Sequence, residues 1–201
     1  MKQNIFPAIR VTLVCLLFFS GVYTMIVLGL AQLAPGAGKG EIIQNNALTA
    51  KLGTETLNPQ PASYYYANVG QKFTNDKYFW SRPSAVDYNA GGAGGSNKGP
   101  SNPDYLQVVK DRIDTFLVHN PGVDKSKIPS DLVTASGAGL DPHISVQAAN
   151  VQVKRIAKIR GIAEPNILQL VLANIEKPLL GIAGTERINV LKLNLALDNL
   201  K

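Results

Sequence analysis

The sequence is poor in the residue types that build covalent cross-links and metal sites. Its 201 residues include one cysteine, Cys15, and two histidines. A lone cysteine excludes a disulfide within the chain and a multi-thiolate metal site. His119 and His143 also lack the close spacing to cysteine or carboxylates that a zinc site requires. We therefore expect no metal, no firmly bound cofactor and a fold stabilised by packing.

Long blocks of like charge are absent too. Lys and Arg number 20 against 14 Asp and Glu, a net charge of +6, but the basic residues are scattered along the chain. Without a run of about five or six like charges, this excess does not indicate a nucleic-acid-binding tail. The length suits one domain of ordinary size plus one membrane helix, and we find no repeat of fixed period.

The sequence does contain a long apolar run near its start. Residues 11–33 carry no charge, and at about 1.5 Å per residue they form about 34 Å of helix, enough to cross a bilayer. A cleaved signal peptide is the alternative, with Ala31 and Ala34 near the cleavage site, but its apolar core is only about 7 to 15 residues long. We therefore predict a retained transmembrane helix over residues 11–33.

The charges beside this run predict its orientation. Lys2 and Arg10 precede it, and positively charged flanks stay in the cytoplasm. Residues 1–10 are therefore predicted to form the cytoplasmic tail of a single-pass protein of the cell (inner) membrane. Everything after the helix is then carried across, to the outside or to the periplasm.

The chain beyond the helix is predicted to begin with a stalk. Residues 34–62 are rich in Gly, Ala, Pro and Asn, with a helical turn or a strand at residues 41–43. Three tyrosines at residues 64–66 then predict a strand, or alternatively an aromatic anchor at the lipid headgroups. Residues 63–201 are predicted to form one extracytoplasmic domain.

Helical patterns recur within this domain. Asn102 as a cap, Pro103 in the first turn and apolar residues at helical spacing predict a helix that ends at residues 120–121. A second helix is predicted from residue 145 to a stop at Gly161, and a third over residues 165–176.

The end of the chain shows a different period. Apolar residues alternate with small or polar ones over residues 190–198, which predicts a half-buried strand. Helices mixed with short strands indicate an α+β or α/β soluble domain, carried by one N-terminal transmembrane helix. The strand order cannot be read from this pattern.

Residues 131–143 bring a serine, an aspartate and a histidine close together in sequence. A hydrolase would use Ser136 as nucleophile, His143 as base and Asp141 as its orienting group. The nucleophile elbow is incomplete, however, because Thr134 occupies the position of its first glycine. Triad members also usually come from distant parts of a chain, so we expect no catalytic residue here.

The same loop has glycines that could expose backbone amides to a phosphate. Residues 136–139 read Ser-Gly-Ala-Gly, but neither the dinucleotide-binding nor the P-loop pattern is completed. As a nucleotide site the loop is weak on its sequence alone.

Two further segments have the composition of binding surfaces. Residues 77–84 place three aromatics beside two cations, as in partner interfaces. Alternatively, Phe79 and Trp80 fill the core while Arg82 stacks on a ring. Residues 91–103 are predicted to form a glycine-rich loop, and long loops in compact domains often bind ligands or partners. The partner-contact residues predicted from both segments are Tyr78, Phe79, Trp80, Arg82, Gly94, Gly95, Ser96 and Asn97.

Taken in order, these segments resemble the KdpC family, the C subunit of the Kdp potassium-transporting ATPase. The similarity covers essentially the whole chain. It is carried by Tyr-Phe-Trp-x-Arg-Pro-Ser at residues 78–84, Gly-Gly-Ser-Asn at residues 94–97 and Thr-Ala-Ser-Gly-x-Gly-Leu-Asp-Pro-His-Ile-Ser at residues 134–145. The departures, at residues 62–68 and at Pro178, where threonine is expected, concern local structure.

The resemblance implies a membrane complex that transports K⁺. The partners would be a channel-like potassium-binding subunit, a P-type subunit that hydrolyses ATP and a very small membrane peptide. This chain would be a non-catalytic accessory subunit, described for the family as a catalytic chaperone that raises the ATP affinity of the pump subunit. The nucleotide contacts that the resemblance implies are Ser136, Gly137, Gly139 and Gln147.

The predicted topology conflicts with direct nucleotide contact. An exported domain lies across the membrane from cytoplasmic ATP, so Ser136 and Gln147 cannot reach it. We therefore expect an exterior role, in holding the channel-like subunit together or shaping the approach of K⁺, with ATP affected only through the complex. A membrane-anchored surface hydrolase and a solute-binding module are the alternatives.

Overall fold

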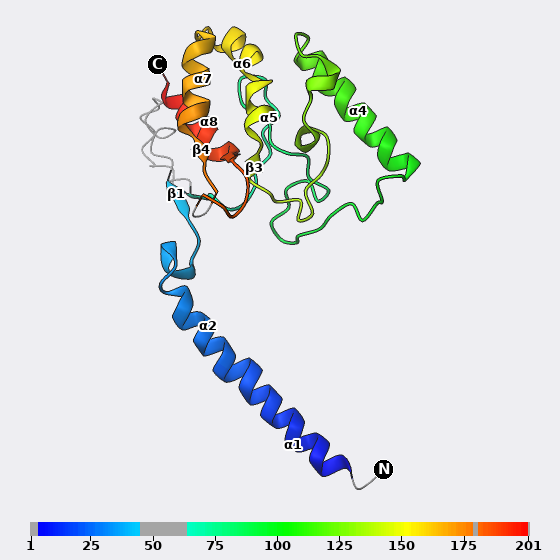
Figure 1. Ribbon diagram of the computed structural model, residues 1–201, viewed down its shortest axis with the longest axis vertical. Coiled ribbons are helices and arrows are strands. Elements are labelled where there is room, and N and C mark those ends of the chain that lie inside the picture. Colours follow the sequence, from blue (N-terminus) through cyan, green and yellow to red (C-terminus); the bar gives the residue numbers. More distant parts are fainter. Residues whose placement is uncertain (1–3, 45–63, 179–180, 201) are drawn as a thin grey trace, which may run out of the picture. The chain divides into compact units, whose positions relative to one another are not determined.

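The computed structural model describes residues 4–44, 64–178 and 181–200. The chain divides into two compact units, Met1–Ile42 and Ile43–Lys201. The first contains the N-terminal helix and the second contains the folded domain (Figure 1). Helices and small sheets occur together in the domain, which confirms the predicted α+β class.

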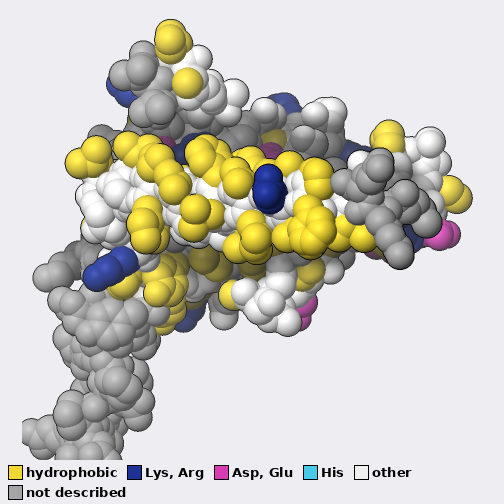
Figure 2. Space-filling model, turned by 90° about the horizontal axis from the view of Figure 1, so that it is seen from below, with side chains coloured by type: hydrophobic (Ala, Val, Ile, Leu, Met, Phe, Trp, Pro, Cys, Tyr) yellow, Lys and Arg dark blue, Asp and Glu magenta, His cyan; other side chains and the backbone are white. Residues whose placement is uncertain are grey.

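The N-terminal helix is predominantly apolar, with Arg10 as the one charged residue among its described residues. It consists of α1 (Ile5–Leu16), a wider π-helical stretch η2 (Leu17–Tyr23) and α2 (Thr24–Ala31). Its mean hydropathy reaches 2.4, and apolar side chains cover the helix in the foreground of Figure 2. By length and composition it can cross a membrane, as predicted, although the helix begins at Ile5 rather than at residue 11.

Short strands form two sheets. β1 (Ile42–Gln44) pairs with β2 (Tyr64–Tyr66), the strand predicted at the three tyrosines. The second sheet has the order β3–β5–β4 and is antiparallel throughout. Its strands are β3 (His143–Ile144), β5 (Arg187–Asn189) and β4 (Ile175–Glu176). Most of the predicted stalk, residues 34–62, lies outside the described residues.

Helices supply most of the domain's regular structure. In chain order they are α4 (Pro103–His119), α5 (Val146–Asn150), α6 (Val153–Arg160), α7 (Glu164–Ala173) and α8 (Val190–Asn199). Short 3₁₀ turns, η4 (Lys125–Lys127) and η5 (Ser130–Leu132), connect α4 to the sheet. Figure 1 shows α4 along one flank of the domain and α5 to α8 gathered on the other.

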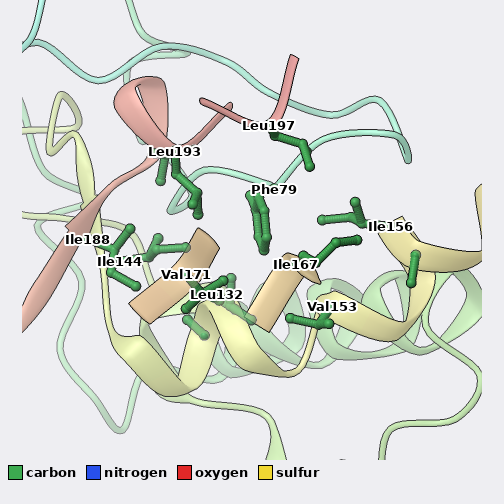
Figure 3. Packing of buried hydrophobic residues seen from close by; sticks show 14 of the residues in the cluster. Phe79, Leu132, Ile144, Val153, Ile156, Ile167, Val171, Ile188, Leu193 and Leu197 are labelled. Carbon is green, nitrogen blue, oxygen red and sulfur yellow. The ribbon is translucent and has the colours of Figure 1, made fainter. Parts of the chain in front are cut away.

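Phe79 lies at the centre of the core, although it belongs to no helix or strand. Its side chain is fully buried, and Figure 3 shows it between side chains from α6, α7 and α8. Ile156, Ile167 and Leu193, one from each of these helices, are fully buried as well. Burial of each such side chain stabilises the fold by roughly 1.5 to 3 kcal/mol, so the core joins the helices to this loop.

The predicted start of α4 and the predicted end of α6 are confirmed. The Asn102 side chain accepts a hydrogen bond from the Tyr105 amide and Pro103 stands in the first turn of α4, so that helix is confirmed. Gly161 follows α6 with φ +66°, the left-handed conformation in which glycine ends helices. Both signals act within a few residues, which is why the sequence reveals them.

The predicted helix over residues 145–160 is wrong in its middle. α5 and α6 are separate, and Gln152 lies at the break between them. The break lets Gln152 turn its amide into the core, where Nε2 donates to Ala148 O at 2.9 Å and Oε1 accepts from Trp80 N at 2.7 Å. A fully buried polar side chain needs these partners, and the bond to Trp80 joins distant parts of the sequence.

The third predicted helix, over residues 165–176, is too long at its end. α7 stops at Ala173, and the last two residues of the predicted helix form β4. Ile175 pairs with Ile188 of β5, so strand pairing takes over from the helix at this point.

The strand predicted over residues 190–198 is wrong, because this segment is α8. Its leucines alternate, but the buried positions Val190, Leu193 and Leu197 are also three and four residues apart, the spacing of one helical face. Asn189 favours the helix over the strand. Its side chain accepts from the Lys192 amide at 3.2 Å and caps the helix.

One residue of α8 replaces a missing strand. Asn194 is buried, and its amide accepts from Phe79 N at 2.9 Å and donates to Phe79 O at 3.0 Å. These are the two hydrogen bonds that a neighbouring strand would provide. Asn194 therefore satisfies the buried backbone of the core loop.

We predict that Asn194→Ala destabilises the protein by about 2 to 5 kcal/mol, because it leaves two buried backbone groups without a partner. Asn199→Ala, at the exposed end of the same helix, is the matched control and should change stability little. Urea unfolding of the full chain in detergent measures both. Equal losses for the two variants would show that the Asn194 hydrogen bonds contribute nothing special.

Candidate functional site

The two glycine segments that the sequence suggested separately meet in the structure. Residues 94–97 and residues 136–139 lie backbone to backbone, and we call them the paired loops. Gly94 N donates to Ala138 O at 3.0 Å, and a Cβ on Gly95 would lie 3.0 Å from Gly137 O. Backbones this close require glycine at the point of contact, because a Cβ atom would collide with the other loop.

Gly139 is the most constrained position of the paired loops. Its φ is +70°, which disfavours any other residue, and a Cβ there would lie 2.7 Å from Val86 Cγ2 and 2.9 Å from Gly94 O. Glycine at this position therefore permits both the positive φ of the turn and the close contact between the loops.

Hydrogen bonds inside the chain engage several of the groups that could bind a phosphate. Ser136 is buried, and its Oγ accepts from Gly139 N at 2.9 Å. Ser136 N in turn donates to Pro83 O at 3.4 Å. The amides of Ser136, Gly139 and Gly94 are therefore directed at protein oxygens, which argues against a phosphate cradle in this loop.

Gln147 lies at the exposed start of α5, outside the paired loops. Its Nε2 donates to Lys127 O at 3.2 Å and so ties α5 to the turn η4. The structure gives it a local partner in this way. Its assignment to a nucleotide stays a prediction.

His143 is held between two carboxylates. Nδ1 lies 3.4 Å from Asp141 Oδ1, and Nε2 lies 3.2 Å from Glu176 Oε2. The His143 side chain is the main cause that lowers the pKa of Asp141 to about 2; the His143 amide and Arg82 lower it further, and burial opposes them. Because Nε2 faces Glu176, the histidine is not arranged as the base of a triad with Ser136.

A cleft of about 360 Å³ opens beside His143. It is lined by groups of both signs, among them Arg82, Asp131, Asp141 and Arg187. In the described part of the chain neither Ser136 nor Gln147 lines this cleft. The described residues also contain no cluster of three or more His, Cys, Asp or Glu that could hold a metal ion.

The side chains of residues 77–84, which we call the aromatic segment, are buried to different extents. Phe79 is in the core, so it can affect a partner only through its neighbours. The Trp80 ring lies 5.0 Å from the Arg155 guanidinium and 4.8 Å from the His119 ring. The Tyr78 hydroxyl donates to Asp198 at 2.9 Å. These three side chains therefore have partners within the chain.

One of the two cations within residues 77–84 lies beside a ring, since Lys77 Nζ is 5.1 Å from the centre of the Tyr78 ring. Arg82, for which stacking on a ring was the alternative to a partner contact, forms an ion pair with Asp141 at 3.1 Å and donates to Thr134 O at 3.3 Å. Arg160 lies over the Tyr78 ring at 4.9 Å, as Arg155 does over Trp80. Arg155 and Arg160 come from α6, which is distant from this segment in the sequence but packs near it in the fold.

Arg155 is the residue whose importance the sequence did not reveal. It is buried and donates to Gln152 Oε1 at 2.7 Å, to Asn120 Oδ1 at 3.0 Å, to Tyr78 O at 3.1 Å and to Asp76 O. Burial lowers its pKa to about 10, against the opposing effect of Asp76. Its partners Asp76, Tyr78 and Asn120 are distant in the sequence, so no local pattern indicates this role.

The exposed part of the candidate contact surface is small. Ser96 and Asn97 are exposed, and Asn97 adopts φ +52°, a left-handed conformation that asparagine tolerates. They extend from the backbone contact between the paired loops. The structure thus presents these two polar side chains from a fixed base.

Comparison with known proteins gives a consistent result over the whole chain. The family model described as "KdpC: K+-transporting ATPase, c chain" matches residues 5–199. Proteins called potassium-transporting ATPase KdpC subunit from Flavobacterium psychrophilum and Bacteroides thetaiotaomicron are each 48% identical, over 99% of this chain and 100% of theirs. The protein of that name from Caldanaerobacter subterraneus is 44% identical over 98% of this chain and 95% of its own.

We predict that Gly139→Ala lowers the stability of the domain by about 2 kcal/mol or more, because the new methyl group is strained by its positive φ and collides with Val86 and Gly94. Gly137→Ala is the control, since a Cβ there has nothing within 4 Å. Thermal unfolding and limited proteolysis of residues 91–103 measure the effect. A Gly137→Ala variant as unstable as Gly139→Ala would contradict the proposed packing of the paired loops.

Proposed function

This chain belongs to the KdpC family, and from that premise we propose that it holds the channel-like and ATP-hydrolysing subunits of the complex together from the outer side of the membrane. Membership makes it a subunit of the K⁺-transporting ATPase, and not the subunit that hydrolyses ATP. We propose, beyond family membership, which subunits this chain contacts, on which side of the membrane its domain lies and how it affects ATP.

The observation that carries the proposal is the contact between the paired loops. Their glycine backbones touch, so Ser96 and Asn97 are presented from a base that needs little ordering when a partner binds. A surface organised in advance loses less conformational entropy on binding than a free loop does. This favours a partner-binding role for residues 94–97, with the aromatic segment supporting them from within.

The position of the domain follows from the flank of the N-terminal helix. Lys2 and Arg10 lie before the apolar run, and basic flanks are retained in the cytoplasm. The helix is long enough to carry the rest of the chain across. We therefore assign the domain to the outer face, where K⁺ enters the channel-like subunit.

The effect on ATP is assigned to coupling through the complex. The hydrogen bonds of Ser136, Gly139 and Gly94 within the chain leave these amides engaged, and Gln147 is bound to the Lys127 carbonyl. A subunit that favours one state of its neighbours can change their ATP affinity without touching the nucleotide, typically by about 1 to 3 kcal/mol. K⁺ is the transported ion, and no nucleotide contact on this chain is needed.

We predict that Ser96→Arg lowers recovery of the channel-like subunit on purification of the tagged chain by on the order of tenfold, because an unpaired charge would be buried at the contact. Ser101→Arg adds the same charge at another exposed serine of the loop and is the control. Co-purification from mild detergent measures recovery, with the ATPase activity of the complex determined in parallel. Full recovery with the folded Ser96→Arg variant would remove these residues from the contact.

A further inference from the structure

A further hollow of the described domain lies away from the paired loops. It is a groove of about 650 Å³ between the end of α4, the turn after it, the break between α5 and α6 at Val151, and α6. Aliphatic side chains form much of its wall, and they come from three separate segments. These side chains are Val118, Val123, Val151 and Ile159.

The rim of the groove is positively charged. Lys154 and Lys158 are one helical turn apart on α6, both exposed, and the described residues give neither an ion-pair partner. The acid in the groove, Asp76, is already engaged by His119 Nδ1 at 2.9 Å and faces Arg155 Nη1 at 3.5 Å. The two lysines therefore present uncompensated charge to whatever occupies the groove.

The aliphatic side chains next to these lysines are unusually accessible. Val118 is 77% exposed and Ile159 is 51% exposed. Exposed aliphatics beside lysines are the combination found where proteins lie at a membrane interface, since the apolar groups enter the acyl boundary and the lysines meet anionic headgroups. Here both kinds of side chain line the same groove.

The same wall lacks what a protein partner usually requires. Interface hot spots are dominated by Trp, Tyr and Arg. Trp80 is covered by Arg155 and His119, and the Arg155 side chain is itself only 3% exposed. Among the described residues that line the groove, Arg155 is the one Trp, Tyr or Arg, and Trp80 is not part of the lining. Charge complementarity and the flexible aliphatic wall therefore favour an anionic lipid over a protein segment.

The chain also keeps a bilayer within reach of the groove. Residues 32–41 join the apolar helix, which ends at Ala31, to β1, which begins at Ile42, and even fully extended they span at most about 36 Å. Tethering of this kind raises the effective concentration of membrane lipid around the domain. Weak contacts from two lysines are then enough to populate a bound state.

We propose that this groove binds an anionic phospholipid, with the headgroup phosphate on Lys154 and Lys158 and the glycerol and upper acyl chain against Val118 and Ile159. The contact would fix one face of the domain to the membrane surface. It does not depend on which subunits the paired loops touch, so it can fail or hold independently of the function proposed above.

The test uses the full chain with Cys15→Ser, reconstituted in vesicles of phosphatidylcholine alone or mixed with phosphatidylglycerol. An environment-sensitive fluorophore is attached at Val118→Cys, or as a control at Leu172→Cys, which is 63% exposed on α7 and outside the groove. We expect brighter, blue-shifted emission at position 118 only in the vesicles that contain phosphatidylglycerol, and no such change at position 172.

Charge variants then identify the ligands. Lys154→Gln with Lys158→Gln should lower the ratio of docked to undocked domain by about 30-fold, the effect of two lysines at an anionic surface. Lys110→Gln with Lys177→Gln removes the same charge from exposed lysines outside the groove and should leave the ratio unchanged. All four substituted lysines are exposed, so we expect the variants to fold, and thermal unfolding verifies this.

Three results would overturn the proposal. One is equal emission at position 118 with and without phosphatidylglycerol, and another is an equal effect of the two charge variants. The third is a change at position 118 that occurs only when the partner subunits are added in detergent without this lipid, which would assign the groove to a protein segment.

Discussion

The structure depends on the way in which buried side chains satisfy the backbone of residues 76–80. This segment crosses the core without joining a sheet, so its amides and carbonyls need partners from elsewhere. Asn194 binds both backbone groups of Phe79, Gln152 accepts from the Trp80 amide, and Arg155 donates to the carbonyls of Asp76 and Tyr78. Polar groups of α6, α8 and the α5–α6 break are therefore what place the apolar Phe79 at the centre.

That arrangement continues outward to the surface loops. After residue 80 the chain is held by Arg82, which binds Asp141 and Thr134 O, while the Tyr88 hydroxyl donates to the carbonyl of Arg82. Pro83 O then accepts from Ser136 N, and the glycine backbones of the paired loops close the contact. The segment that fills the core thus also fixes the surface at Ser96 and Asn97, which explains how a domain with such short strands can present a defined contact site.

The sequence predicted what is decided within a few residues. The apolar helix, the Asn102 cap and the stop at Gly161 all follow from local chemistry. The strand expected at residues 190–198 failed because alternating leucines also fit a helical face, and the hydrogen bond of Asn189 that decides the matter carries no periodic signal. Contacts such as Asn194 to Phe79, 115 residues apart, leave no trace in a single sequence. For the same reason the candidate residues were identifiable, but the engagement of the Ser136 and Gly139 amides was not.

The central claim is that the domain acts from the side of the membrane opposite to ATP, and labelling of cysteines tests it most directly. In a Cys15→Ser background, a cysteine at the exposed Ser96 and, separately, one at Asn4 before the apolar helix are treated with a membrane-impermeant maleimide. With any outer membrane permeabilised, our account predicts that position 96 reacts in intact cells and position 4 only after lysis. The reverse pattern would place the domain beside cytoplasmic ATP and contradict the account.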